Sequence, residues 1–316
     1  MFFSKKVKLG IAIAIMYVSF LLYFMLHEEL LPKKNASSDS FSYPNALIFF
    51  NDICYMLAAF IAVLITKAQL PKNPFPFIAI SLPQQAGMAC VNYAHKYVNY
   101  PTFQVMKAAK PMSVMLCKLL IFHQRIDIKT IYVVILLSIG LIIFGVNCHF
   151  ESKSYIGVLY ACGALFCDAI YVPIVDKLKV GNGGPFVTMF YNYMWSTLIV
   201  FILRFTEIFD AVFWIFKHQK EFLPKLLLFG VTGSIGQISL FAAIGLSDGL
   251  VLSIATTTRK LVTIVLSSIV FGHNLNSRQW LGVGIVFTAL GIEIFFKSKK
   301  KVKIEQSDAL DVREKI

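Results

Sequence analysis

Residues 251–271 read VLSIATTTRKLVTIVLSSIVF, an apolar stretch with three threonines, Arg259 and Lys260 at its centre. Roughly 20 apolar residues are enough to cross the ~30 Å hydrocarbon core of a bilayer as an α-helix. A cation at the centre of such a helix costs about 2.5–3.5 kcal/mol on the translocon scale, so intramembrane cations face the protein interior or a water-filled cavity. The stretch therefore predicts a membrane helix that lines a polar cavity.

The composition of the whole chain indicates the same class. Its 316 residues are 57% hydrophobic and 15% charged, whereas soluble domains carry about 25% charged residues. Long apolar runs recur from end to end. The first run is long and lacks a small-residue cleavage site, so we interpret it as a membrane span and not as a signal peptide. We predict an all-α polytopic membrane protein.

The apolar runs predict ten transmembrane helices joined by short connections with Pro, Gly and Asn. Only two connections, 27–44 and 205–222, are longer. The ten spans are expected at about 7–26, 45–67, 76–95, 101–122, 130–148, 154–176, 185–204, 223–246, 248–271 and 279–296.

The distribution of basic residues predicts the orientation. Ten crossings place both termini on one side, where 17 Lys and Arg lie against 9 on the other side. Cytosolic loops carry the excess of Lys and Arg, so we expect both termini in the cytosol. The basic residues lie next to span ends, which argues against a nucleic-acid partner. The one N-glycosylation sequon, Asn35-Ala-Ser37, then falls on the non-cytosolic side.

A repeat relates the two halves of the chain. When the sequence is shifted by about 150 residues, the fourth span falls on the ninth and Lys110 meets Lys260. Two similar groups of five spans must be inverted because five is odd, and inverted repeats are typical of secondary transporters with a substrate site near the midplane. We therefore divide the chain into a first five-helix repeat (1–150), a second (151–296) and a basic tail (297–316) that we expect to be disordered.

Polar and basic residues follow one face of each of these two spans, at steps of three and four. Arg259 lies about 100° from the face of the ninth span, and Pro111 is expected to bend the fourth span. The residues predicted to line the cavity are Gln104, Lys107 and Lys110 on the fourth span and Ser253, Thr256, Lys260 and Thr263 on the ninth.

The intramembrane charges do not balance. Lys107, Lys110, Arg259 and Lys260 lie at membrane depth with two deeply placed acids, Asp52 and Asp168. An anion such as a diphosphate ester would neutralise the surplus, with arginine as a bidentate ligand and lysine as a point charge. The alternative is structural: the cations pair with the two acids or with backbone carbonyls. Asp168 fits either a counter-ion or a substrate contact.

Three further features bear on function. Glycines 230, 233 and 236 on the eighth span predict close helix packing. The six cysteines form no CxxC pair and the histidines lack ligand spacing, so neither a metal nor a cofactor is indicated. A membrane transferase would carry acid or histidine clusters at one membrane face. The acids here are scattered, so we do not expect an enzyme.

Several segments resemble a known family. Residues 99–116, NYPTFQVMKAAKPMSVML, are similar to the fourth span of nucleotide-sugar transporters in the drug/metabolite transporter superfamily. Thr256-Thr-Thr-Arg259-Lys260, with Phe271-Gly-His and Arg278-Gln-Trp-Leu-Gly, resembles the ninth and tenth spans. The nearest branch looks like the UDP-galactose-transporter homologues of the endoplasmic reticulum, related to carriers of the sulfate donor PAPS. Gly236-Gln237 and Cys167-Asp168 are similar to motifs of the same branch.

This resemblance implies ten helices in two inverted halves, with a cytosolic nucleotide derivative exchanged for a lumenal nucleotide. It implies that Lys107, Lys110, Arg259 and Lys260 bind phosphate, with Gln237 and Asp168 as further cavity residues. The chain departs from the family at Phe24-Met-Leu-His27-Glu28, where the family has Gly-x-x-Gln-Glu, and at Ala169, where it has glycine. The tail lacks a dilysine retrieval spacing, so the endoplasmic reticulum and the Golgi both stay open.

The leading hypothesis is an antiporter that exchanges a cytosolic UDP-sugar, such as UDP-galactose, for lumenal UMP by alternating access. An ATP/ADP exchanger or PAPS transporter would use the same phosphate ligands, and a drug or metabolite exporter would share the fold. The base, the sugar and whether the chain forms a homo-oligomer stay open at this stage.

Overall fold

The regular elements in the described part of the chain are all helical. The computed structural model describes residues 5–30, 41, 43–94, 97, 106–107, 109–123, 126–145, 154–181, 183–247, 255–256, 258–259, 262, 277–278, 280–289 and 292. Within these residues the elements are α1 (Lys5–Leu30), α2 (Pro44–Thr66), η1 (Phe75–Phe77), α3 (Ile78–Ala94), α5 (Lys110–Leu120), α6 (Ile128–Gly145), α7 (Ser154–Gly181), α8 (Pro185–Leu203), α9 (Phe205–Lys217) and α10 (Gln219–Leu246).

Five of these helices are long and apolar enough to cross a membrane, which agrees with a polytopic membrane protein. They cover Val7–His27, Asn45–Thr66, Tyr155–Leu178, Pro185–Leu203 and Gln219–Leu246. Shorter apolar helices cover Phe75–Val91, Ile128–Ile143 and Trp280–Ala289, within the predicted third, fifth and tenth spans. Most of the predicted ninth span (248–271) lies outside the described residues, as does the tail.

The long connection predicted at 205–222 contains a helix. Residues 205–217 form α9, and α10 begins at Gln219, so nearly the whole connection is helical. The segment FTEIFDAVFWIFK carries apolar residues at steps of three and four, which is the period of a helix with one apolar face. At 13 residues it is too short to span a bilayer, so a prediction based on span length did not count it as a membrane helix.

The helices pack into two compact units. Unit 1 contains residues 1–89 and 170–255, and unit 2 contains residues 90–169 and 256–316. The division falls inside α3 and α7, so each unit takes segments from both predicted repeats. Packing and sequence similarity group the helices differently, and the repeat boundary near residue 150 stays a prediction.

Polar and aromatic contacts fix the directions of α2, α3 and α8 in unit 1. Residues of α2 meet residues of α8 in reverse order, 52 with 196, 55 with 193 and 60 with 190, so the two helices are antiparallel. Residues of α3 meet α8 in the same order, 81 with 192 and 85 with 196, so these two are parallel. α2, α3 and α8 fall on the predicted second, third and seventh spans. Successive spans cross a bilayer in alternating directions, so the observed directions agree with this order of spans.

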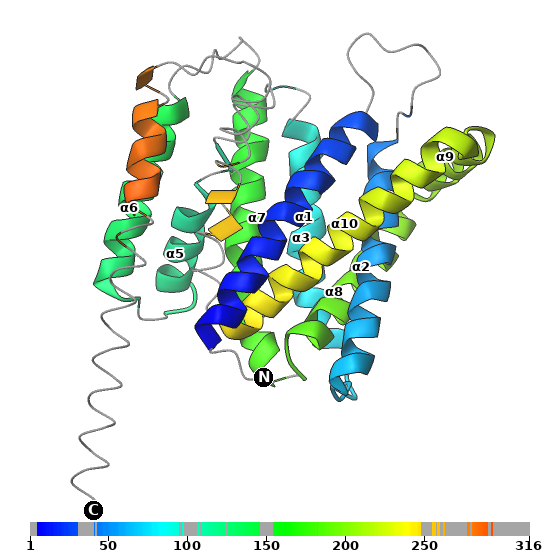
Figure 1. The fold of residues 1–316 in the computed structure, drawn as a ribbon, viewed down its shortest axis with the longest axis horizontal. Helices are drawn as coiled ribbons and strands as arrows, with labels where there is room; N and C mark the ends of the chain where they lie inside the picture. Colours follow the sequence, from blue (N-terminus) through cyan, green and yellow to red (C-terminus); the bar gives the residue numbers. More distant parts are fainter. Residues whose placement is uncertain are drawn as a thin grey trace, which may run out of the picture. The chain divides into compact units, whose positions relative to one another are not determined.

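α10 packs against both α1 and α2 through its glycines. A Cβ at Gly233 would lie 2.6 Å from the hydroxyl oxygen of Tyr55, and one at Gly236 would lie 3.2 Å from the ring of Phe20. A Cβ at Gly230 would lie 2.8 Å from the sulfur of Cys54. The contacts make α10 antiparallel to α1 and parallel to α2, and Figure 1 shows α1 (blue) and α10 (yellow) side by side. The predicted close packing at these glycines is confirmed.

We expect Gly233→Ala to destabilise the protein by about 1–3 kcal/mol, because an added methyl group has no room beside Tyr55. Gly10→Ala on α1 is the matched control, since nothing lies within 4 Å of a Cβ there, and it should keep or raise stability because alanine is the better helix former. Midpoints of thermal unfolding in detergent measure both effects. Equal midpoints for the two variants would contradict the close contact.

Candidate functional site

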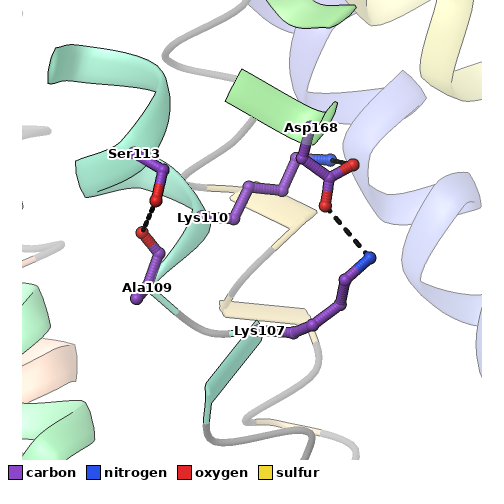
Figure 2. A network of polar contacts seen from close by, with 5 residues as sticks. All are labelled: Lys107, Ala109, Lys110, Ser113 and Asp168. Atoms are coloured by element: carbon purple, nitrogen blue, oxygen red, sulfur yellow. Dashed lines mark hydrogen bonds and ion pairs between the residues drawn. The ribbon is translucent and has the colours of Figure 1, made fainter. Parts of the chain in front are cut away.

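Two lysines and one aspartate of unit 2 form a charged cluster (Figure 2). Lys107 Nζ lies 3.0 Å from Asp168 Oδ2, and Lys110 Nζ lies 3.2 Å from Asp168 Oδ1. One carboxylate of α7 therefore holds an ammonium group on each oxygen. The side chains are 13%, 22% and 20% exposed for Lys107, Lys110 and Asp168, so the cluster is partly shielded from solvent.

The local sequence explains where the lysines lie. The described helix α5 starts at Lys110 with Pro111 in its first turn, so the bend expected at Pro111 is a helix start. Proline suits this position because its missing N–H would have no intrahelical partner there. The first turn of α5 contains no acid, and Ala109 at its N-cap makes no side-chain hydrogen bond. The positive end of the α5 dipole therefore adds to the positive charge of the lysines.

The cluster has more positive than negative charge. Unit 2 also contains Arg259, which is half-buried. Among the predicted site residues described in this unit, three cations stand against one carboxylate, which leaves a surplus of two positive charges. Such a surplus suits a dianionic ligand, since buried charges require compensation. The contact with Asp168 also matches the structural alternative, in which the aspartate is the permanent counter-ion of the lysines.

The other predicted site residues are placed only in part. Thr256 is half-buried in unit 2, whereas Gln237 belongs to unit 1. In the described part of the chain, the buried side-chain oxygen of Gln237 has no hydrogen-bond partner. Predicted residues outside the described ranges are Asn35, Gln104, Ser253, Lys260 and Thr263.

In the described part of the chain, the partners of Asp52 are neutral hydrogen-bond donors. The aspartate belongs to unit 1, where its Oδ2 accepts hydrogen bonds from Gln85 Nε2 at 2.9 Å and from the hydroxyl of Ser196. No ion pair of Asp52 occurs within the described ranges. Neutral donors from α3 and α8 satisfy this acid, and no local pattern in the sequence indicated them. These contacts favour a structural role of Asp52 inside unit 1.

Sequence reasoning missed a buried cation. Lys118, in the last turn of α5, is only 3% exposed. Lys118 lies near the end of the predicted fourth span, and it is one of the 17 basic residues counted on the terminal side. It follows Pro111, Val114 and Met115 by seven, four and three residues, so it shares the buried face of α5, and this spacing was the signal that could have indicated it.

His27 and Ala169, at which the chain departs from the family pattern, both pack inside the protein. The ring of His27 stacks on Phe229 with centroids 5.6 Å apart and lies 6.1 Å from Tyr23. Ala169, next to Asp168, is only 4% exposed. A small residue is thus kept beside the aspartate, as in the family, while His27 belongs to an aromatic cluster.

Comparisons with known proteins agree with the motifs. The model of the UAA transporter family matches residues 8–297. UDP-galactose transporter homolog 1 of Candida albicans is 27% identical over 78% of this chain and 72% of its own length. Adenosine 3'-phospho 5'-phosphosulfate transporter 1 of Dictyostelium discoideum is 29% identical over 91% and 83%. Solute carrier family 35 member B1 of Danio rerio is 28% identical over 94% and 95%. The resemblance inferred from the motifs is confirmed.

A solved crystal structure shares the fold. It covers 89% of this chain and 97% of its own chain with a TM-score of 0.61. The sequence identity is 10%, so this likeness concerns the fold alone.

Asp168→Asn should destabilise the empty protein by about 1–3 kcal/mol, because Lys107 and Lys110 lose their shared carboxylate and repel each other. The midpoint of thermal unfolding at low salt measures the loss, with Asp210→Asn on the exposed surface of α9 as the control. Adding Lys107→Met to Asp168→Asn should restore part of the loss. A double variant no more stable than Asp168→Asn would contradict the repulsion.

Proposed function

The chain belongs to the UAA transporter family, and we propose that it is an antiporter that exchanges a cytosolic UDP-sugar, such as UDP-galactose, for lumenal UMP. The protein is a transporter and not an enzyme, as its family and its relatives indicate. Relatives named for UDP-galactose and for adenosine 3'-phospho 5'-phosphosulfate support a nucleotide that carries phosphate as the substrate class.

The observation that carries this proposal is the sharing of Asp168 between Lys107 and Lys110. A substrate phosphate and the Asp168 carboxylate are both acceptors for the same ammonium groups. Binding then replaces one carboxylate by a diphosphate with more charge and more acceptor oxygens. Arg259 adds a planar donor that binds phosphate in a bidentate manner. Lys260, its neighbour in sequence, is the fourth proposed ligand.

The same charges account for obligatory exchange. An empty cavity holds a surplus of positive charge, which is costly to move through a low-dielectric region. A bound anion neutralises the surplus and lowers the barrier to reorientation. UDP-sugar and UMP both supply this negative charge, so each promotes one direction of alternating access.

An adenine nucleotide or PAPS is the second candidate substrate. The relative named for adenosine 3'-phospho 5'-phosphosulfate is 29% identical, about as similar as the relative named for UDP-galactose at 27%. The phosphate ligands would be the same, and the difference would lie in the groups that contact the base.

We also propose a location in the endoplasmic reticulum or Golgi with both termini in the cytosol. The excess of Lys and Arg on the terminal side supports this orientation. A compartment with a lumen also fits the proposed exchange, in which the UDP-sugar enters the lumen and UMP leaves it.

Lys110→Ala and Arg259→Ala should each weaken nucleotide binding by about tenfold or more, because a charge-assisted contact contributes roughly 1.5–3 kcal/mol. Arg259→Lys should restore binding only in part, since an ammonium group lacks the planar fork. The readout is the rise in thermal midpoint with added UMP or UDP-galactose. Exposed Lys72 provides the control Lys72→Ala, which should behave as the natural protein. A folded Lys110→Ala protein with full stabilisation by nucleotide would rule out the phosphate site.

Counterflow in proteoliposomes tests the exchange itself. Vesicles preloaded with UMP should take up labelled UDP-galactose several-fold faster than empty vesicles, because the returning carrier needs an anion. Acceleration by ADP or AMP alone would favour the adenine-nucleotide alternative. Equal uptake into empty and preloaded vesicles would contradict antiport.

A further inference from the structure

α9 presents three different faces. Its buried face carries Ile208 and Ala211. Ala211 packs in an apolar cluster with Leu30 of α1, Leu47 of α2 and Phe222 of α10. A second face is polar and exposed and carries Thr206, Asp210 and Lys217. The third face is apolar and exposed, and its residues are Phe205, Phe209, Val212, Phe213 and Phe216. At 3.6 residues per turn these five side chains lie within an arc of about 100°.

The direction of the neighbouring helices places α9 at one surface of the membrane. α2 is antiparallel to α8 and parallel to α10, so α8 and α10 cross the bilayer in opposite directions. Both ends of α9 therefore lie on the same side. Its 13 residues measure about 20 Å, which is too short for a bilayer core of roughly 30 Å. Figure 1 shows α9 where α2 begins.

A carboxylate fixes the rotation of α9 about its axis. Glu207 Oε1 accepts the backbone N–H of Asn45 at 3.1 Å, and Oε2 accepts its side-chain N–H at 2.7 Å. Asn45 lies in the first turn of α2, where a negative charge is favourable. With Glu207 and the buried face both held by neighbouring helices of unit 1, Phe209, Phe213 and Phe216 are left exposed, while the ring of Phe205 packs edge-on against Phe201 of α8. Phe213 and Phe216 are 73% and 69% exposed.

The exposed phenylalanines continue the lipid-facing surface of the adjacent spans. Ile202 and Leu203 end α8, Leu223 and Leu227 begin α10, and all four side chains are exposed. Exposed Lys217 and Lys220 follow directly at the end of α9. Aromatic residues on one side of a helix and lysines beside them are typical of helices that lie in the membrane interface. Lysine stems cover apolar surface while the ammonium group reaches the headgroups.

We propose that α9 is an interfacial helix that binds the bilayer surface. Its phenylalanine face enters the boundary between headgroups and acyl chains, and Lys217 and Lys220 bind the phosphate groups of anionic lipids. With the termini in the cytosol, this surface is the lumenal leaflet. This site is separate from the charged cluster and does not depend on which substrate is carried.

Photo-crosslinking from the face itself tests the proposal. Benzoyl-phenylalanine replaces Phe213 in one variant of the full chain and Asp210, on the polar face, in a matched control. Each protein is reconstituted in vesicles of phosphatidylcholine and phosphatidylserine, irradiated and analysed by mass spectrometry. We expect lipid adducts at position 213 at least fivefold above those at 210. Equal adducts at both positions, no lipid adduct at 213, or a crosslinked dimer formed through 213 would overturn the proposal.

A charge reversal tests the headgroup contact. Benzoyl-phenylalanine at Phe216 is combined with Lys217→Glu and Lys220→Glu, and the ratio of phosphatidylserine to phosphatidylcholine adducts is measured. The ratio should fall at least twofold because the acids repel anionic headgroups. Lys72→Glu in a different connection is the control and should leave the ratio unchanged. A ratio unaffected by the double reversal would overturn the assignment of Lys217 and Lys220.

Discussion

Every charge at membrane depth needs a partner, and this constraint decides how the described helices pack. In unit 2 the carboxylate of Asp168 meets both Lys107 and Lys110, and it thereby ties the start of α5 to α7. In unit 1 Asp52 meets neutral donors of α3 and α8. Hydrocarbon supplies no hydrogen bonds, so each acid can be buried only where other helices bring donors to it.

The two acids have different consequences. The described partners of Asp52 are an amide and a hydroxyl of unit 1, which are neutral donors and indicate a structural role. Asp168 has two cationic partners and is about one-fifth exposed, so an anion is able to compete with it. In the proposed exchange, Asp168 neutralises part of the positive charge of the empty cavity. The substrate phosphate neutralises more of this charge and thereby allows the carrier to reorient.

Close packing of unit 1 supports this exchange in a different way. The glycines of α10 bring it against α1 and α2 at distances that larger side chains would prevent. Close packing of this kind makes separate movements of α1, α2 and α10 costly, so in the proposed exchange we expect these three helices to move together. The proposed interfacial helix α9 would hold one end of this bundle at a constant depth in the bilayer.

The sequence by itself determined the membrane class, five of the ten predicted spans, the close packing at the α10 glycines and the family resemblance. These features follow from hydropathy, helical period and short motifs, all of which are local properties of the chain. Tertiary structure alone decided which partners each acid has, because these partners are far away in the sequence. Asp168 lies 58 residues from Lys110, and Asp52 lies 144 residues from Ser196. The tertiary structure also decided which faces of the helix 205–217 are buried, since Ala211 packs with residues of α1, α2 and α10 while Phe213 is exposed. Local pattern predicts that a polar or apolar face exists, and only the packing of distant helices determines what that face contacts.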